Sequence, residues 1–235
     1  MDIIWHGYSC FTIKTKGCTT VLDPYGSEIG LNPPALKADI VLVSREHPGH
    51  NNVKGVQGEF KVVDWAGEYE IKGVAISAQK IEPKESDAGK KPVMFFTLDI
   101  DNIRICFLGD IGKGLNEELI ESIGNVDVLL LPVGGGDAMD AKTAHGVVEQ
   151  LEPRAVIPMH YAIPGLKETF EGVDVFLKLC GATVAKRQIH HQRPQRTLRR
   201  KNRIYSTESH SVAKRKRSQL KQTWPRSSMD RIRHS

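Results

Sequence analysis

Histidine and aspartate residues follow four apolar segments of the chain, at the points where buried strands are expected to end. These residues are Asp23, His47, His50, Asp110 and His160, which come after the segments 21–22, 39–44, 103–108 and 155–158. An α/β sheet exposes such loops at one edge. Neutral imidazole together with carboxylate is the ligand mixture that suits zinc, iron or manganese. The pattern therefore predicts a metal site at a sheet edge.

The segments that must position these loops have the composition of short strands. Three early segments, 3–5, 10–13 and 19–22, predict a meander with turns at Gly7 and Gly17. The apolar run 39–44 predicts a buried strand with a functional loop at its end. Further short strands are expected at 61–63, 69–71 and 74–76, and a hairpin is expected from 95–100 and 103–108 around Asp101 and Asn102.

The second half of the chain alternates between helical and strand patterns. Helices are expected at 116–123 with Asn116 as N-cap, at 141–151 with Asp140 as N-cap, and at 168–179 with Gly181 just past the end. Buried strands are expected between them at 126–131 and 155–158. Early strands followed by β-α-β units predict a mixed α/β sandwich.

Composition limits the cellular setting. The chain is 40% hydrophobic, but it has no apolar run of the roughly 18 residues that a membrane span needs. Residues 1–5 lack a basic region followed by an apolar stretch, so no secretory signal is expected. The cysteines Cys10, Cys18, Cys106 and Cys180 have no C-x-x-C spacing and are expected to be reduced core residues rather than disulfides or ligands. We predict a cytoplasmic protein that has no membrane partner.

Charge divides the chain near Ala185. Residues 186–235 contain 16 Lys and Arg against two acids, whereas residues 1–185 contain 17 basic and 26 acidic residues. The basic segment has almost no apolar periodicity, so we expect a disordered tail. Three interpretations remain open: a nucleic-acid-binding arm, a solvated tail without a defined role, and a read-through or frame-shifted extension that is not native. The basic clusters 199–203 and 214–217 motivate the first, and the abrupt change in composition motivates the last.

The segment 43–52, Val-Ser-Arg-Glu-His-Pro-Gly-His-Asn-Asn, resembles the H-x-H-x-D-H signature of the metallo-β-lactamase superfamily. The order Asp23, this loop, Asp110 and His160 matches the order of motifs in that superfamily. The segments 5–11, 67–74 and 131–135 resemble the branch of ascorbate-6-phosphate lactonase-like zinc-dependent hydrolases. The resemblance covers residues 1–185 and implies a four-layer αββα sandwich.

The resemblance implies an incomplete ligand set. The first histidine of the signature falls on Arg45, the second on His47, the aspartate on Gly49 and the third histidine on His50. The middle histidine, expected between residues 77 and 89, is missing, because there is no histidine between His50 and position 145.

The later motifs of the family are retained. The bridging aspartate falls on Asp110 and the last histidine on His160, while Asp23 matches an aspartate that mainly supports the loop. Of one metal's imidazole ligands only His47 remains. The other site keeps His50, Asp110 and His160, so a single ion is expected, zinc first, with manganese or iron as alternatives. Such a site lowers the pKa of water toward about 7.

Arg45 is open to two interpretations. Its permanent charge stands where a ligand is expected and repels a dication. Alternatively, its guanidinium fills the vacated site and holds Asp110 or a substrate phosphate. We predict that Asp110 and Arg45 carry the chemistry, and that His47 is a fourth ligand or supports the ligands from behind.

Other candidates have plainer explanations. Glu46, Glu85 and Asp87 are more simply explained as solvated acids than as replacement ligands. His6 is expected to make a structural hydrogen bond, and His145 to lie on a helix surface. The glycines 134–136 lack the Lys-Ser/Thr of a phosphate-binding P-loop and predict a tight loop near the site.

Three functions follow from these patterns. The first is a metal-dependent hydrolase of a small substrate, either phosphorylated or an ester or lactone. The second is a catalytically degenerate relative that acts in binding or as a scaffold, motivated by the three lost ligand positions. The third is nucleic-acid processing through the basic tail. The sequence does not specify an oligomeric state.

Overall fold

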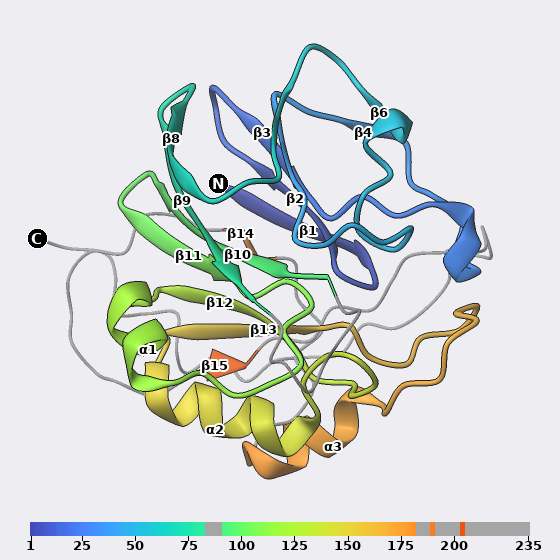
Figure 1. Ribbon diagram of the computed structural model, residues 1–235, viewed down its shortest axis with the longest axis vertical. Coiled ribbons are helices and arrows are strands. Elements are labelled where there is room, and N and C mark those ends of the chain that lie inside the picture. The colour runs from blue at the N-terminus through green and yellow to red at the C-terminus, as the bar shows by residue number, and fades with distance from the viewer. Residues whose placement is uncertain (83–90, 182–188, 191–202, 205–235) are drawn as a thin grey trace, which may run out of the picture.

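The computed structural model describes residues 1–82, 91–181, 189–190 and 203–204, and in it two β-sheets pack face to face (Figure 1). The first sheet contains, in spatial order, β14 (Ile189–His190), β1 (Asp2–Gly7), β2 (Cys10–Lys14), β3 (Thr19–Leu22), β5 (Ile40–Leu42) and β7 (Lys61–Val63). The second contains β15 (Arg203–Ile204), β13 (Ala155–Met159), β12 (Val128–Pro132), β11 (Ile103–Phe107), β10 (Val93–Ile100), β9 (Val74–Ile81) and β8 (Gly67–Ile71).

The core between the sheets follows from the alternation of side chains along the strands. Phe11 and Leu22 of the first sheet and Phe95 and Phe107 of the second belong to one buried cluster. The rings of Phe11 and Phe107 meet edge to face with centroids 6.4 Å apart. Because successive residues of a strand point to opposite faces, each sheet also has an outer face that must be covered.

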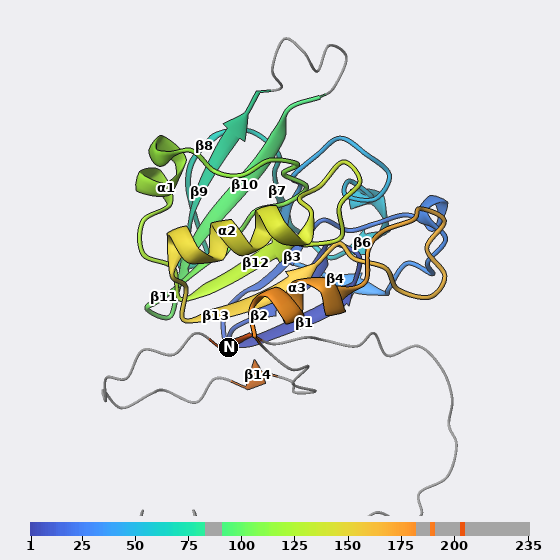
Figure 2. The same cartoon turned by 90° about the horizontal axis from the view of Figure 1, so that it is seen from below.

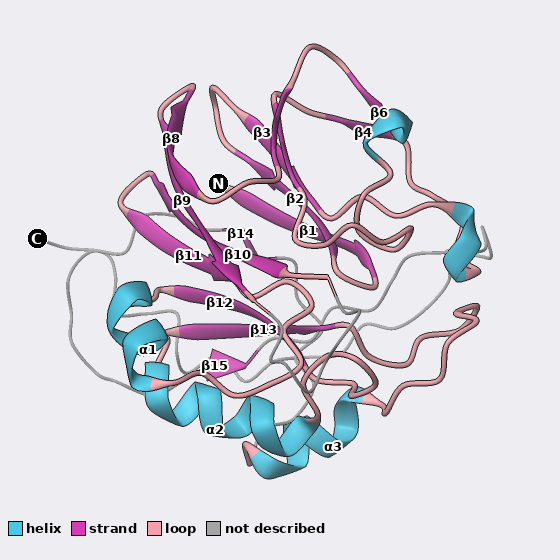
Figure 3. Ribbon diagram, viewed as in Figure 1, coloured by secondary structure: helices cyan, strands magenta, loops and turns pink. Residues whose placement is uncertain are grey.

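The two outer faces are covered differently. The helices α1 (Glu117–Ile123), α2 (Ala141–Leu151) and α3 (Val173–Leu179) all lie beside the second sheet, and Figure 2 shows α2 and α3 in front of β12 and β13. Over the first sheet lie the single-turn helices η1 (Ser27–Ile29) and η2 (Val53–Gly55) and the small sheet of β4 (Leu36–Lys37) and β6 (Val56–Gln57), as Figure 3 shows.

A second buried cluster joins this outer layer to the first sheet. It contains Val21 and Val41 from the strands, together with Ile29, Leu36 and Val56 from the elements above them. The neighbouring residues of β3 and β5 point the other way, into the core between the sheets. The α/β sandwich predicted from the sequence is therefore confirmed, with one helical outer layer and one made largely of short turns and strands.

Most predicted elements are confirmed at their predicted positions. The hairpin of β10 and β11 turns at Asp101 and Asn102, which both have positive φ. The side chains of Asn116 and Asp140 accept hydrogen bonds from Leu119 and Thr143 and cap α1 and α2 as predicted. The described cysteines are all free, and only Cys180 is not fully buried.

The predicted helix 168–179 is wrong in its first part, because α3 begins only at Val173, after Gly172. The preceding segment instead bonds to neighbouring loops: the Glu171 amide donates to the carbonyl of Gly134, and its carbonyl accepts from Ala162. This pairing keeps the segment out of the helix, and Phe170 packs against Tyr8 with ring centres 5.9 Å apart.

The basic segment is described at only four residues. Ile189–His190 pairs antiparallel with β1, and Arg203–Ile204 pairs parallel with β13. The rest of the predicted tail, including the cluster 214–217, lies outside the described residues, and the boundary near Ala185 stays a prediction. Within the described part of the chain, every helix is too short or too polar to span a membrane.

Candidate metal centre

The candidate site lies where the two sheets present the carboxyl ends of their parallel strands to one another. Strands β3 and β5 are parallel, and Asp23 and His50 lie in the loops that follow them. Strands β11, β12 and β13 are also parallel, and Asp110 and His160 follow the first and last of these. The His160 amide donates to the carbonyl of Tyr8, 3.0 Å away, and links the β1–β2 turn to the end of β13.

Three of the predicted ligands converge in the protein interior. One ligand atom each from His50, Asp110 and His160 lies within 4.8 Å of the others, and all three residues are buried. His50 Nε2 lies 3.7 Å from Asp110 Oδ2, and His160 Nε2 lies 3.2 Å from Asp110 Oδ1. These two distances run to different oxygens of the Asp110 carboxylate, and both are near the roughly 3.4 Å that separates tetrahedral ligands at about 2.1 Å from one ion.

The hydrogen bonding of these atoms also fits a metal. Among the described residues, His50 Nε2, His160 Nε2 and Asp110 Oδ1 are buried without a hydrogen-bond partner. A buried polar atom without a partner costs about 1–3 kcal/mol, so native proteins rarely leave three together. A divalent cation held by these residues would give all three atoms a partner.

Asp23 orients the His50 ring through Nδ1, the ring nitrogen that does not face Asp110. Its Oδ2 lies 2.6 Å from His50 Nδ1, and its Oδ1 accepts a 2.7 Å hydrogen bond from the Ser44 amide. In the neutral tautomer that donates from Nδ1 to Asp23, the lone pair is on Nε2, the atom that faces Asp110. Carboxylates commonly orient metal-binding histidines in this way. Asp23 therefore has the supporting role expected from the sequence.

Arg45 lies where the first histidine of the signature would stand, and it binds two carboxylates. Its Nη1 donates to Asp110 Oδ2, and its Nη2 lies 3.2 Å from Asp137 Oδ2. The Asp110 side chain is 2% exposed, whereas that of Asp137 is 59% exposed. The guanidinium therefore supplies positive charge to the buried carboxylate at a position where the resemblance implies a metal ligand.

The other sequence candidates lie outside the group of three. His47 lines the same cavity, but its Nδ1 accepts from the Gly49 amide, and its ring centre lies 5.9 Å from that of His50. Glu46 is exposed and pairs with Lys91, while His6 bonds to Thr12. His145 lies on α2, with its Nδ1 3.5 Å from a Glu149 oxygen. Glu85 and Asp87 lie outside the described residues.

The buried groups shift one another's pKa values. Burial lowers the pKa of His50, but Asp23 and Asp110 outweigh burial, and the net shift is upward. Burial raises the pKa of Asp110, but His50, His160 and Arg45 outweigh it, and the net shift is downward. Burial lowers the pKa of His160 to about 4, which keeps this imidazole neutral at pH 7 with a lone pair on one ring nitrogen.

The backbone at the site adopts conformations that are uncommon away from glycine. Asp23, His160 and Tyr8 have φ values of 44°, 52° and 53°. Residues in this region cost energy and concentrate at functional sites. Gly109 also has positive φ, and a Cβ there would lie 2.5 Å from the Cβ of Ser44, so only glycine allows this close approach next to Asp110.

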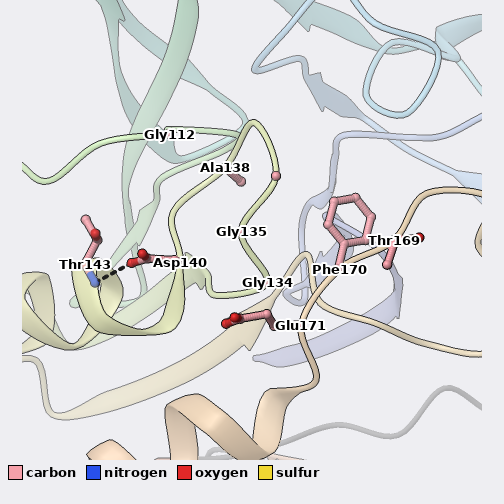
Figure 4. A pocket seen from close by; sticks show the side chains of 10 residues that line it. Gly112, Gly134, Gly135, Ala138, Asp140, Thr143, Thr169, Phe170 and Glu171 are labelled. Carbon is pink, nitrogen blue, oxygen red and sulfur yellow. Dashed lines mark hydrogen bonds between the residues drawn. The ribbon is translucent and has the colours of Figure 1, made fainter.

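One cavity adjoins the group of three, and a second cavity adjoins the first. The first, of about 330 Å³, is lined by Tyr8, Arg45, His47, Asp110, Gly136, Asp137, His160, Glu168, Thr169 and Phe170. The second, of about 530 Å³, is formed by the glycine loop 134–136 together with Asp140, Phe170 and Glu171 (Figure 4). Gly136, Thr169 and Phe170 line both cavities, so the glycine loop lies at the mouth of the site, as the sequence predicts.

The sequence analysis missed Tyr8 and Phe170 as site residues. The Tyr8 ring centre lies 4.3 Å from that of His160, and Phe170 contacts His160 edge-on at 4.7 Å. Burial raises the pKa of Tyr8, and Asp110 and Glu168 raise it further. Tyr8 lies in the segment 5–11 that carries the resemblance, which is the signal that points to it. Phe170 falls in the part of the predicted helix that does not form.

Comparison with known proteins places these residues within one recognised domain. The family described as the Beta-lactamase superfamily domain matches residues 2–160, which include every residue of the group of three. A UPF0173 protein of Pyrococcus abyssi is 28% identical over 184 residues, covering 70% of this chain and 85% of that protein. A UPF0173 metal-dependent hydrolase of Thermoplasma volcanium is 30% identical over 192 residues, covering 68% of this chain and 83% of that protein.

A solved structure is also similar over most of the chain. It is a Thermotoga maritima protein assigned as a Zn-dependent hydrolase of the metallo-β-lactamase superfamily. The two chains are 32% identical, with a TM-score of 0.71, and the match covers 88% of this chain and 99% of that one.

Proposed function

The chain belongs to the β-lactamase superfamily domain family, and from this premise we propose that it is a metal-dependent hydrolase with a single-metal site held by His50, Asp110 and His160. The observation that carries the proposal is the set of three buried, mutually facing ligand atoms without hydrogen-bond partners. The names of the relatives support the class of reaction. Two imidazoles and one carboxylate suit zinc first, and manganese or iron next.

A divalent cation at this position supplies Lewis acidity, which activates water and polarises a carbonyl or phosphoryl oxygen. The residues of the chain define the rest. Asp23 holds the His50 ring in the tautomer that leaves Nε2 unprotonated. Arg45 fixes Asp110 and presents its partly exposed guanidinium to the cavity, where it orients an anionic group of the substrate.

The cavity supports a small substrate. Its volume of about 330 Å³ is at the lower end of the range for small-molecule sites. Arg45 supplies the cationic group on its wall, beside the acids Asp110, Asp137 and Glu168, and we propose that this guanidinium binds the anionic part of a phosphorylated compound or polarises an ester or lactone. His47 faces this substrate rather than completing the group of three ligands.

The experiment that tests the site is elemental analysis of the protein purified without chelator. We expect about one equivalent of metal, and its loss in the double variant His50→Ala, His160→Ala. His145→Ala is the matched control, because it removes an imidazole at a distance from the site. Full metal content in the double variant contradicts the assignment.

A second function is favoured by the Arg45–Asp110 contact. A guanidinium that already neutralises the carboxylate allows the domain to remain folded without metal and to act by binding alone. A screen of esters, lactones and phosphoesters with zinc, manganese or iron distinguishes the two functions. Turnover that disappears in His50→Ala supports the hydrolase, and no turnover by the loaded protein supports the binding function.

A further inference from the structure

Tyr8 is held at the centre of the site by bonds from both sheets. Its carbonyl accepts hydrogen bonds of 3.0 Å from the indole nitrogen of Trp5 and from the amide of His160. The residue is 2% exposed and has a φ of 53°. A buried aromatic residue in the left-handed region persists only where its surroundings fix it.

The ring of Tyr8 covers the two ligand imidazoles. Its centre lies 4.3 Å from the ring of His160 and 5.2 Å from the ring of His50. A Cβ added at Gly49 would lie 2.6 Å from Tyr8 Cε1 and 3.3 Å from Cζ. A side chain at position 49 and the ring of Tyr8 therefore exclude one another. Tyr8 occupies the space into which the aspartate of the signature would extend.

The hydroxyl of Tyr8 can donate a hydrogen bond into the cavity. Tyr8 lines the cavity with Arg45, His47 and Glu168. Its hydroxyl makes no hydrogen bond to another residue of the described part of the chain, whereas the hydroxyls of Tyr25 and Tyr69 both donate to backbone carbonyls. A tyrosine keeps its proton at neutral pH, so the group is a hydrogen-bond donor.

We propose that Tyr8 is the substrate-contacting hydrogen-bond donor of this centre, with its ring in place of the missing aspartate ligand and its hydroxyl donating to a carbonyl or phosphoryl oxygen of the substrate. The proposal rests on the proposed function, because the substrate oxygen would contact both Tyr8 and an ion held by His50, Asp110 and His160. In ester or phosphoester hydrolysis negative charge develops on this oxygen, and a positioned donor stabilises it. Tyr8 keeps its proton, so no covalent step passes through it.

The test is calorimetric binding of inorganic phosphate to the zinc-loaded full-length protein. We expect Tyr8→Phe to keep one equivalent of zinc and to bind phosphate about tenfold or more weakly, because a hydrogen bond to a charged group is lost. Tyr69→Phe is the matched control: it also loses one phenolic hydrogen bond, at the exposed Trp65 carbonyl, and we expect wild-type affinity.

The outcomes separate the two proposals. Equal phosphate affinity in Tyr8→Phe and wild type overturns the role of Tyr8, as does an absence of phosphate binding by the loaded wild type. Loss of zinc in Tyr8→Phe also overturns it, because the residue would then serve the ligands instead of the substrate. Failure of the wild type to hold zinc, manganese or iron contradicts the proposed function itself, and with it this role.

The steric exclusion between Tyr8 and Gly49 is tested by a double-mutant cycle on thermal unfolding. Gly49→Asp is expected to lower the Tm strongly in the wild-type background and much less in the Tyr8→Ala background. An equal loss of Tm in both backgrounds shows that the ring does not fill the place of a side chain at position 49.

Discussion

The two sides of the metal centre differ in how they place positive charge beside Asp110. On one side, His50 and His160 direct ring nitrogens without partners toward the carboxylate, an arrangement that a cation completes. On the other side, the guanidinium of Arg45 already binds it. One carboxylate thus faces an ion site and a permanent organic cation. The comparison teaches that Asp110 is paired with a cation on its Arg45 side whether or not an ion is bound on the other side.

The largest expected effect comes from removing the carboxylate that both sides share. Asp110→Ala deletes a metal ligand and leaves Arg45 with only the more exposed Asp137. Breaking a buried charge pair costs about 3–5 kcal/mol of unfolding free energy. We expect a loss of this size in urea unfolding and no bound metal.

Asp137→Ala is the matched control for this change, since it removes the other carboxylate bound by Arg45 at a largely exposed position. Exposed pairs contribute at most about 1 kcal/mol. Similar losses in the two variants would mean that the burial of Asp110 does not distinguish it, and the comparison of the two sides would fail.

The metal affinity of the group formed by His50, Asp110 and His160 can be lowered without removing a ligand. Asp23→Asn places an amide beside His50 Nδ1 and no longer favours the tautomer with a free Nε2. Loss of such supporting carboxylates lowers metal affinity by about 10–100-fold. Competition with a chromophoric chelator measures the change in Kd. Asp39→Asn serves as control, because Asp39 bonds the Thr19 amide in the same sheet but away from the site, and it should leave the Kd unaltered.

Much of this centre is predictable from the sequence, because strand ends and loop order are local signals. Asp23, His50, Asp110 and His160 follow apolar strands, and parallel strands necessarily bring such loops to one edge. The caps at Asn116 and Asp140 are equally local. That Arg45 binds Asp110 was one of two interpretations, since a guanidinium both repels metal and attracts carboxylate, and the fold decides between them.

The remainder depends on contacts between distant parts of the chain. Phe170 has a helical pattern around it, but bonds from Glu171 to the loops at Gly134 and Ala162 override that propensity. The role of Tyr8 depends on the absence of a side chain at Gly49, some 40 residues away in the sequence. His47 has the right spacing for a ligand, yet its ring accepts a local amide, an outcome that sequence spacing does not encode.

The contribution of the Arg45 guanidinium to stability can be tested by comparing metal-free and metal-loaded protein. Arg45→Met keeps much of the side-chain length but leaves Asp110 without its guanidinium. We expect the metal-free protein to lose about 3 kcal/mol of stability, because the buried Asp110 carboxylate is left without its cation, and the loaded protein to lose less, because the bound ion still compensates Asp110. Thermal unfolding with and without zinc gives both values. Arg104→Met, which breaks the exposed pair with Asp99, is expected to act equally in both forms.

The smallest effects on the site are expected from the basic segment, which supplies no residue to either side of the centre in the described part of the chain. Two truncations separate its parts. Ending the chain after Tyr205 keeps the short pairings of Ile189–His190 with β1 and of Arg203–Ile204 with β13, whereas ending it after Ala185 removes both. Metal content should be the same in both, with a slightly lower Tm in the shorter chain.

The same two truncations test the proposed nucleic-acid-binding arm. If the cluster 214–217 binds phosphates, the steep salt dependence of binding to DNA or RNA disappears in both truncations. If the cluster 199–203 binds them, the salt dependence disappears only in the chain that ends after Ala185. Equal binding by the full chain and by residues 1–185 rules out an arm. A change in metal content on either truncation would show instead that the basic segment also contributes to the metal site.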